Sequence, residues 1–156
     1  MNVYCKSGIN QMKVAVKTII EIINKMDEKD LIKRPFPNKR SIGELLEHIA
    51  LICKADLLIS EGASQEEMNQ FYSTNHLKNL NEIKEALLTH FHNLEKVFMS
   101  FTEEELQQVT TSYWGVSYNR FEWLLEMMAH MYHHRGQLHS MLVHCYEKDL
   151  NIPLFE

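Results

Sequence analysis

A chain of 156 residues, 45% hydrophobic and 24% charged, has the size and composition of one soluble domain, so we expect residues 1–156 to fold around a single core. Its net charge is −5 and its 16 Lys and Arg are scattered along the sequence, which argues against nucleic acid as a partner. No apolar run is long enough to cross a bilayer and the N-terminal segment lacks the apolar core of a signal peptide, so we expect a cytoplasmic protein with no membrane partner.

Helical periodicity dominates the chain, which contains only five Gly and three Pro. In the first periodic segment, apolar residues recur at spacings of three and four from Ile9 to Met26, typical of a helix in a bundle. Pro35 and Pro37 then disfavour helix in the connection that follows. The sequence therefore predicts an all-α protein whose first helix ends before residue 34.

The second helix begins at a capping box, because Ser41 is followed three residues later by Glu44. We expect this helix to end at about Glu61 or Gly62. Residues 62–78 are polar and without helical period, so we expect an irregular surface connection that is long enough to cross over the bundle.

A third helix is predicted from Asn79 or Asn81, and its apolar face comprises Ile83, Leu87, Phe91, Leu94, Phe98 and Phe101. Thr102 and Glu105 have the spacing of a second capping box, which predicts a short extra turn.

The stretch from Val109 to Tyr118 has no helical period, and we expect a loop or short extended structure there. Asn119 and Glu122 then form a capping pair, and the last helix runs to about Cys145. The apolar seam of this helix is Leu124, Met127, Met131, His134, Leu138, Met141 and Cys145. Four helices and the connection at 62–78 predict a four-helix bundle with one long crossover.

The three cysteines, Cys5, Cys53 and Cys145, are widely spaced and form no CxxC pair. This pattern argues against a disulfide framework and against a thiolate zinc site. Cys53 and Cys145 fall within apolar helical patterns, so we expect both as reduced thiols in the core.

Three histidines on two predicted helices are the strongest candidates for a functional site. His130 and His134 are four residues apart, so on a helix their Cβ atoms lie roughly 5–6 Å from each other on one face. That spacing suits two ligands of one metal ion, each nitrogen at about 2.0–2.1 Å. On the second helix, His48 shares a face with apolar residues, namely Leu45, Ile49, Ile52 and Ile59.

Helical geometry sorts the histidines of the last helix. At about 100° per residue, His134 lies roughly 20–30° and His130 roughly 60–70° from the centre of the apolar seam. His133, His139 and His144 lie more than about 100° away, at the rim or in solvent. A buried imidazole without a partner is costly, so a shared metal ion would explain three inward histidines. The alternative is that each is a core histidine bonded to a backbone carbonyl or a buried water.

Other polar residues could join such a site. His90, on the inner side of the third helix, is either a fourth ligand or a half-buried structural histidine. Glu44 and Glu126 each precede a candidate histidine by one turn, so either could orient an imidazole or complete the coordination. Capping explains Glu44 as well, and solvent exposure explains Glu126.

The segments SIGELLEHIA and HMYHHRGQLHSML together resemble the DinB-like (DinB/YfiT) superfamily of bacterial four-helix bundles. The resemblance covers nearly the whole chain. It implies a divalent metal ion, zinc or nickel, bound by His48, His130 and His134. It also implies that Arg135 and Gln137 orient ligands or pack the helix, and we expect Gly136 to be a close contact between helices.

Some members of that superfamily are thiol-dependent S-transferases or isomerases, so the resemblance implies an S-transferase or a hydrolase-like enzyme. It also implies a small-molecule thiol and an electrophilic substrate as partners, and a homodimer. Three histidines leave an open metal position, as in catalytic sites. One alternative is a non-catalytic metal-binding stress-response protein, and another is a helical interaction module without metal. The aromatic residues Tyr113, Trp114 and Tyr118 either wall the substrate pocket or cover the bundle end or a dimer contact.

Overall fold

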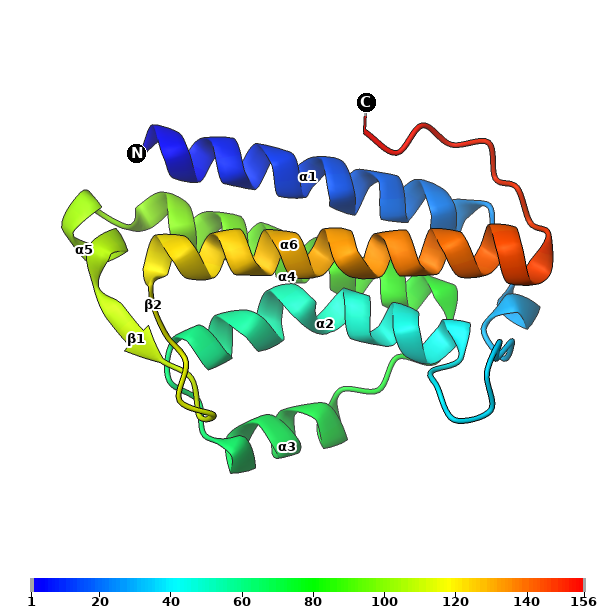
Figure 1. The fold of residues 1–156 in the computed structure, drawn as a ribbon, viewed down its shortest axis with the longest axis horizontal. Helices are drawn as coiled ribbons and strands as arrows, with labels where there is room; N and C mark the ends of the chain where they lie inside the picture. Colours follow the sequence, from blue (N-terminus) through cyan, green and yellow to red (C-terminus); the bar gives the residue numbers. More distant parts are fainter. Residues whose placement is uncertain (1, 156) are drawn as a thin grey trace.

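Four long helices contain most of the buried apolar side chains in the computed structural model, which describes residues 2–155. They are α1 (Val3–Asn24), α2 (Ile42–Ser60), α4 (Leu80–Ser100) and α6 (Arg120–Ser140) (Figure 1). Each starts where a side chain accepts a hydrogen bond from a backbone N–H of the first turn, the caps being Asn2, Ser41, Asn79 and Asn119. The all-α prediction is confirmed. None of the helices in the described residues combines the length and apolar character needed to cross a membrane.

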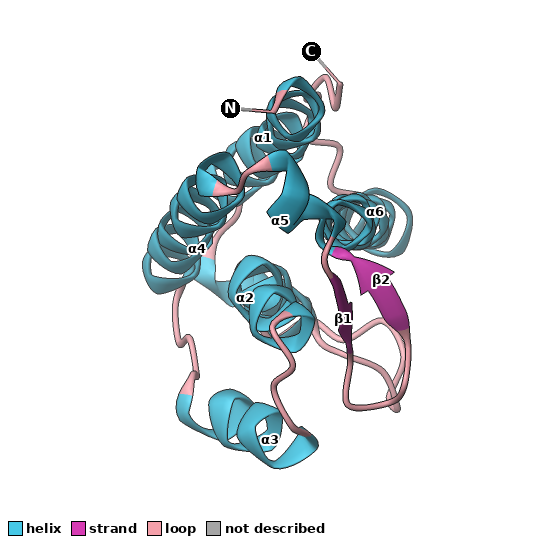
Figure 2. Cartoon of the chain, turned by 90° about the vertical axis from the view of Figure 1, so that its left-hand side faces the viewer, coloured by secondary structure: helices cyan, strands magenta, loops and turns pink. Residues whose placement is uncertain are grey.

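The order of the helices around the bundle is α1, α4, α2 and α6, and α6 closes the ring by packing on α1 (Figure 2). Figure 1 shows that α2 and α4 run in the same direction, opposite to α1 and α6. Two consecutive parallel helices need a connection that returns along the whole bundle. The predicted long crossover is therefore confirmed, and it brings α2 and α6 together as antiparallel neighbours.

The crossover contains a helix that the sequence reasoning missed. Helix α3 (Gln65–Thr74) starts at Ser64, which forms a capping box with Glu67. Its Met68 is buried against the end of α2, in a small separate cluster with Ala55 and Ile59. The expectation of an irregular segment was wrong because one buried anchor leaves almost no periodicity, although the Ser-x-x-Glu spacing was visible.

Shorter elements complete the chain. The turn η1 (Glu28–Asp30) follows α1, and α5 (Glu103–Gln107) is the predicted extra turn capped by Thr102. Strands β1 (Val109–Thr111) and β2 (Ser117–Asn119) pair antiparallel, with Val109 opposite Asn119, which confirms short extended structure there.

Helix α6 continues into a π-helical turn, η2 (Met141–Cys145), and this turn corrects one core prediction. Cys5 and Cys53 are buried free thiols, but Cys145 is exposed. A π turn is wider than an α turn, so it changes the direction of the side chains that follow. Leu142 is therefore the buried residue of this turn, although the predicted apolar seam contained Met141 and Cys145 instead.

The close glycine contact lies at Gly43 and not at Gly136. A Cβ at Gly136 would meet nothing within 4 Å, which overturns the predicted packing role. A Cβ at Gly43 would lie 2.8 Å from the backbone oxygen of Leu31, which also accepts the Gly43 N–H at 2.9 Å. The start of α2 is thereby held against the chain that follows η1.

We predict opposite effects for alanine at these two glycines. Gly43→Ala should lower the free energy of unfolding by about 1–3 kcal/mol, because the backbone carbonyl cannot yield to the added methyl group. Gly136→Ala should raise it by up to about 1 kcal/mol, since alanine is the better helix former in open space. Urea unfolding of both variants measures this, and equal effects would contradict the assignment.

A buried carboxylate joins the α1–α2 connection to the C-terminal segment. Asp30 accepts hydrogen bonds from Lys33 Nζ at 2.6 Å, from Lys148 Nζ at 2.5 Å and from the Asp27 N–H at 2.8 Å. Burial alone would raise the pKa of Asp30, but these three donors hold it well below its ordinary value.

Acid should therefore remove a contribution to stability that Asp30 makes when charged. Because its folded pKa lies below the unfolded value, this contribution is present above about pH 4 and is lost as the pH falls from there. Asp30→Asn should cost about 2–3 kcal/mol at pH 7. The difference between wild type and variant should shrink between pH values of about 5 and 2, measured by urea unfolding. A constant difference over that range would refute this role.

Candidate metal centre

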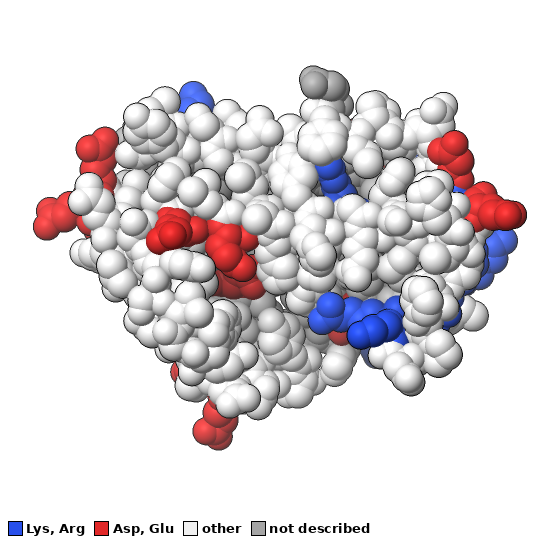
Figure 3. Space-filling view, in the orientation of Figure 1, with Lys and Arg blue, Asp and Glu red and all other residues white. Residues whose placement is uncertain are grey.

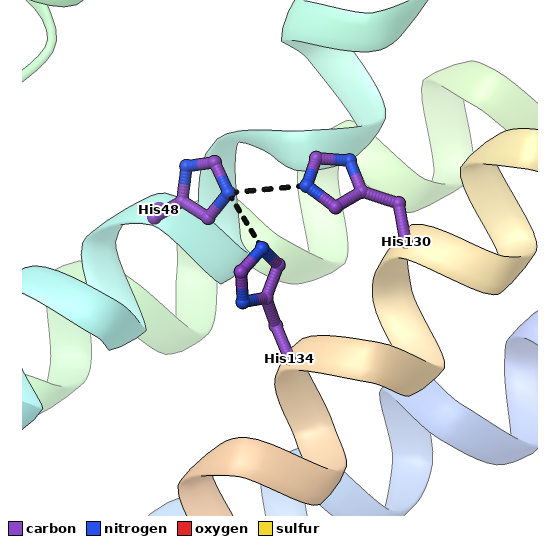
Figure 4. Close-up of side chains that lie close together, drawn as sticks. All are labelled: His48, His130 and His134. Carbon is purple, nitrogen blue, oxygen red and sulfur yellow. Dashed lines mark hydrogen bonds between the residues drawn. The ribbon is translucent and has the colours of Figure 1, made fainter.

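Three imidazole rings meet between α2 and α6 (Figure 4). His48 extends from α2, while His130 and His134 come from successive turns of α6. The Nε2 atom of His48 lies 3.2 Å from that of His130 and 3.1 Å from that of His134. His134 is buried and the other two are half-buried. The structure thus places the three residues singled out from the sequence at one point.

The spacing of these nitrogens fits ligands of one small cation. With bonds of about 2.0–2.1 Å, two nitrogen ligands of a tetrahedral zinc ion lie about 3.3 Å apart. The two measured distances are close to this value. Imidazole nitrogen also suits zinc, nickel, copper and iron, so the donor set is that of a transition-metal site. The three histidines form a group that could hold a metal ion.

Two further side chains orient the rings. The Nδ1–H of His130 donates to Asp56 Oδ2 at 2.7 Å, and the Nδ1–H of His134 donates to Gln137 Oε1 at 2.9 Å. A proton held on Nδ1 leaves the lone pair on Nε2, which is the atom that faces the other rings. Both rings of α6 are therefore fixed in the tautomer that a metal ligand requires.

The electrostatics of the site favour neutral rings at two positions. Burial, the Arg40 charge and the other two histidines lower the pKa of His48 to about 3. Burial and neighbouring histidines also lower the pKa of His134, although the Gln137 contact opposes this. For His130, burial acts to lower the pKa, but the hydrogen bond and charge of Asp56 raise it. Metal binding needs unprotonated nitrogens, so His48 and His134 are ready ligands at neutral pH.

Asp56 is the residue of the site that the sequence reasoning missed. It is 8% exposed and stands on α2, two turns after His48. The available signal was a carboxylate inside the apolar run LICKADLLIS, since a buried charge needs a partner. Asp56, His130 and Glu126 form a second group whose ligand atoms lie within 4.8 Å of one another. Glu126 is exposed at the edge of this group.

The remaining candidates have other partners. The Nδ1–H of His90 donates to the backbone oxygen of Ala50 at 2.9 Å. This contact favours a half-buried structural histidine over a fourth metal ligand. Glu44 accepts from the backbone N–H of Ser41 and from both terminal nitrogens of Arg34. His133 is exposed, as helical geometry predicts.

Arg135 packs the bundle and does not contact the three rings. It is buried, its Nη1 donates to Thr18 Oγ1 at 2.8 Å and to the backbone oxygen of Leu154, and it lies over the rings of Tyr132 and Phe155. It therefore holds the C-terminal segment on α1 and α6, while Gln137 is the residue that orients a ligand.

Two open pockets share Arg40 in their linings, and the smaller of them includes His48. One, of about 400 Å³, is lined by Arg40, Glu44, Glu47, His48, Leu51 and Tyr72. The other, of about 510 Å³, is lined by Pro35, Phe36, Lys39, Arg40, Leu45, Gln137, Ser140, Met141 and Cys145. Both volumes fit a small molecule.

The hairpin aromatics do not line these two pockets. Tyr113 and Trp114 are exposed and pack on each other, and Tyr118 packs edge to face on Trp123 with centroids 4.9 Å apart. Tyr118 covers the bundle end, which favours the second interpretation of this segment. The aromatic wall beside His48 is Tyr72, from the helix that the sequence reasoning missed.

Comparison with known proteins gives a consistent family and fold. The family model of the DinB superfamily matches residues 11–138. The crystal structure of a candidate DinB family member from Exiguobacterium sibiricum 255-15 is 32% identical, with a TM-score of 0.88 and 99% of each chain covered. A DinB-like protein from Bacillus subtilis, YjoA, shares the fold at 20% identity, with a TM-score of 0.71 over 96% of this chain and 97% of its own. Among curated proteins there is no match.

The contact between Asp56 and His130 leads to a prediction on metal affinity. Asp56→Asn should weaken zinc binding by about 10–100-fold, because the carboxylate that orients His130 and increases its basicity is lost. Glu126→Gln, the matched change at the exposed carboxylate nearby, should alter affinity by less than about fivefold. Competition with a chromophoric chelator measures both variants. Equal losses would show that only the negative charge of the region matters.

Proposed function

The chain belongs to the DinB superfamily, and we propose that it is a metal-dependent enzyme that transfers a low-molecular-weight thiol to an electrophilic substrate. In this proposal His48, His130 and His134 bind a divalent ion, zinc or nickel. The observation that carries it is the convergence of three Nε2 atoms beside an open pocket. A closed structural site would have four protein ligands and no such access.

A divalent ion held by these histidines would lower the pKa of a coordinated thiol, so that sulfur is present as thiolate at neutral pH. The protein's own residues hold and orient the ligands: Asp56 and Gln137 keep the Nε2 lone pairs of His130 and His134 directed inward. In the reaction, a carbon–sulfur bond forms and the carbon–chlorine bond of a chloroaromatic acceptor breaks. Chloride leaves with the bonding electrons, and the thiol proton passes to solvent.

The state of the cysteines supports an external thiol. Burial raises the pKa of the Cys5 and Cys53 thiols, and neither is accessible to a substrate. A buried neutral thiol is a poor nucleophile. Cys145 is exposed and lines the larger pocket, so it is the cysteine whose participation an experiment has to separate from that of added thiol.

The pocket walls support a small substrate with an apolar body. The larger pocket includes Phe36, Leu45 and Met141, which can cover the carbon skeleton of an electrophile. The smaller pocket includes His48 and leads to the histidine group. A thiol and an acceptor can therefore approach the site from adjoining spaces that share Arg40.

The proposal predicts metal- and thiol-dependent turnover. Zinc- or nickel-loaded protein, given a panel of thiols and a chloroaromatic or epoxide acceptor, should form thioether products. His48→Ala should reduce the rate at least about 100-fold, because one of three ligands is lost. Cys145→Ser should retain the rate, since the nucleophile is the added thiol. Product formation is followed by absorbance and mass spectrometry.

Two outcomes would contradict this function. The enzyme hypothesis is wrong if wild type turns over no faster than His48→Ala with every thiol of the panel. If chelation then also lowered the melting temperature strongly, the chain would be a non-catalytic metal-binding protein. Loss of activity in Cys145→Ser would instead assign the nucleophile to the protein.

A further inference from the structure

The segment between η1 and α2 carries four basic residues, and within the described part of the chain only two of them have an acidic partner. Lys33 donates to the buried carboxylate of Asp30 at 2.6 Å. Arg34 binds Glu44 through both terminal nitrogens, at 2.9 and 2.8 Å. Within residues 2–155, Lys39 and Arg40 have neither an ion pair nor a side-chain hydrogen bond, and both are exposed.

Arg40 lies where the two pockets adjoin. It lines the smaller pocket together with His48 and Tyr72, and it lines the larger one together with Gln137, which binds His134. Its charge acts to lower the pKa of all three histidines, which is consistent with this position beside them. The residue is fixed at its Cα, because Ser41 immediately after it caps α2.

The acids of the smaller pocket form no ion pair with Arg40, although its charge helps to lower the pKa of Glu44. Glu44 accepts hydrogen bonds from Arg34 and from the Ser41 N–H. Glu47 accepts the N–H of Leu77 at 2.7 Å and lies 3.6 Å from His76. Among residues 2–155, Arg40 therefore has no ion-pair partner, and its guanidinium lies in the pocket that includes His48.

The charge pattern of this face agrees with that arrangement. Figure 3 shows basic side chains on one side of a hollow, near the start of α2, and acidic side chains on the other side, over the first half of α6. Glu126, in the first half of α6, neighbours Asp56 and His130. An anionic ligand group is thus attracted to the Arg40 side and repelled from the opposite side.

We propose that Arg40 binds a carboxylate of the thiol whose sulfur coordinates at the histidine group, so that the enzyme selects carboxylate-bearing thiols over neutral ones. This inference rests on the proposed function. A guanidinium donates parallel N–H hydrogen bonds to both oxygens of a carboxylate, which gives orientation as well as affinity. The two contacts would hold the thiol at both ends and leave the larger pocket for the acceptor.

The test compares mercaptocarboxylates of increasing chain length with the mercaptoalcohols of the same length. Binding is measured on the full-length protein loaded with cobalt(II), whose thiolate charge-transfer absorption reports sulfur coordination. At the best chain length, wild type should bind the carboxylate about three- to tenfold more tightly than the alcohol. In Arg40→Gln this ratio should fall to about one.

Arg34→Gln is the matched control, because it removes the same charge from the same connection at a residue already paired with Glu44. It should keep the wild-type preference. If Arg40→Gln keeps the preference, or if Arg34→Gln loses it equally, Arg40 is not the anchor. Equal binding of acids and alcohols by wild type overturns this inference and leaves the proposed function standing. Absence of any sulfur-to-cobalt absorption overturns the proposed function itself.

Discussion

The packing of α2 against α6 is the constraint on which the candidate site depends. It brings His48 within 3.2 Å of rings that follow 82 and 86 residues later. Such an arrangement places three polar rings between helices, and polar groups in such a position need hydrogen-bond partners. Asp56 and Gln137 accept hydrogen bonds from the Nδ1–H groups of His130 and His134, and a metal ion would bind the Nε2 atoms. The same helix pair therefore provides ligands, their orientation and the wall of a pocket.

The connection before α2 adds a positive charge, that of Arg40, to the surroundings of the histidines. It is anchored by the buried carboxylate of Asp30 and by the close approach of Gly43 to Leu31. These contacts hold the segment that ends in Arg40 next to the two pockets. In our proposal, the histidines bind the metal ion while the Arg40 guanidinium, which has no ion pair among residues 2–155, selects ligands by charge. In this proposal, one short segment contributes both to the stability of the fold and to the choice of ligand.

The errors of sequence reasoning have a common origin, since each concerned a contact between elements. Helix α3 has a single buried anchor, so its apolar period is too weak to see. Gly136 stands next to a candidate ligand in sequence, but open space surrounds it, while the crowded glycine is Gly43. The spacing of Cys145 along the helix assigns it to the apolar seam, but the π turn moves it to the surface. Which residue touches a neighbouring chain segment is not encoded in the spacing along one helix.

What the sequence determined by itself was the set of long helices, their caps and the inward direction of three histidines, because these follow from local hydrogen bonding and from a 3.6-residue period. The metal, the thiol, the homodimer and the location in the cell stay predictions. Only the tertiary structure decided that His130 is held by Asp56, that His90 binds a backbone carbonyl and that Arg40 has no ion pair among residues 2–155. These facts depend on distances between residues far apart in the chain, which are set by how whole helices pack and not by any local pattern.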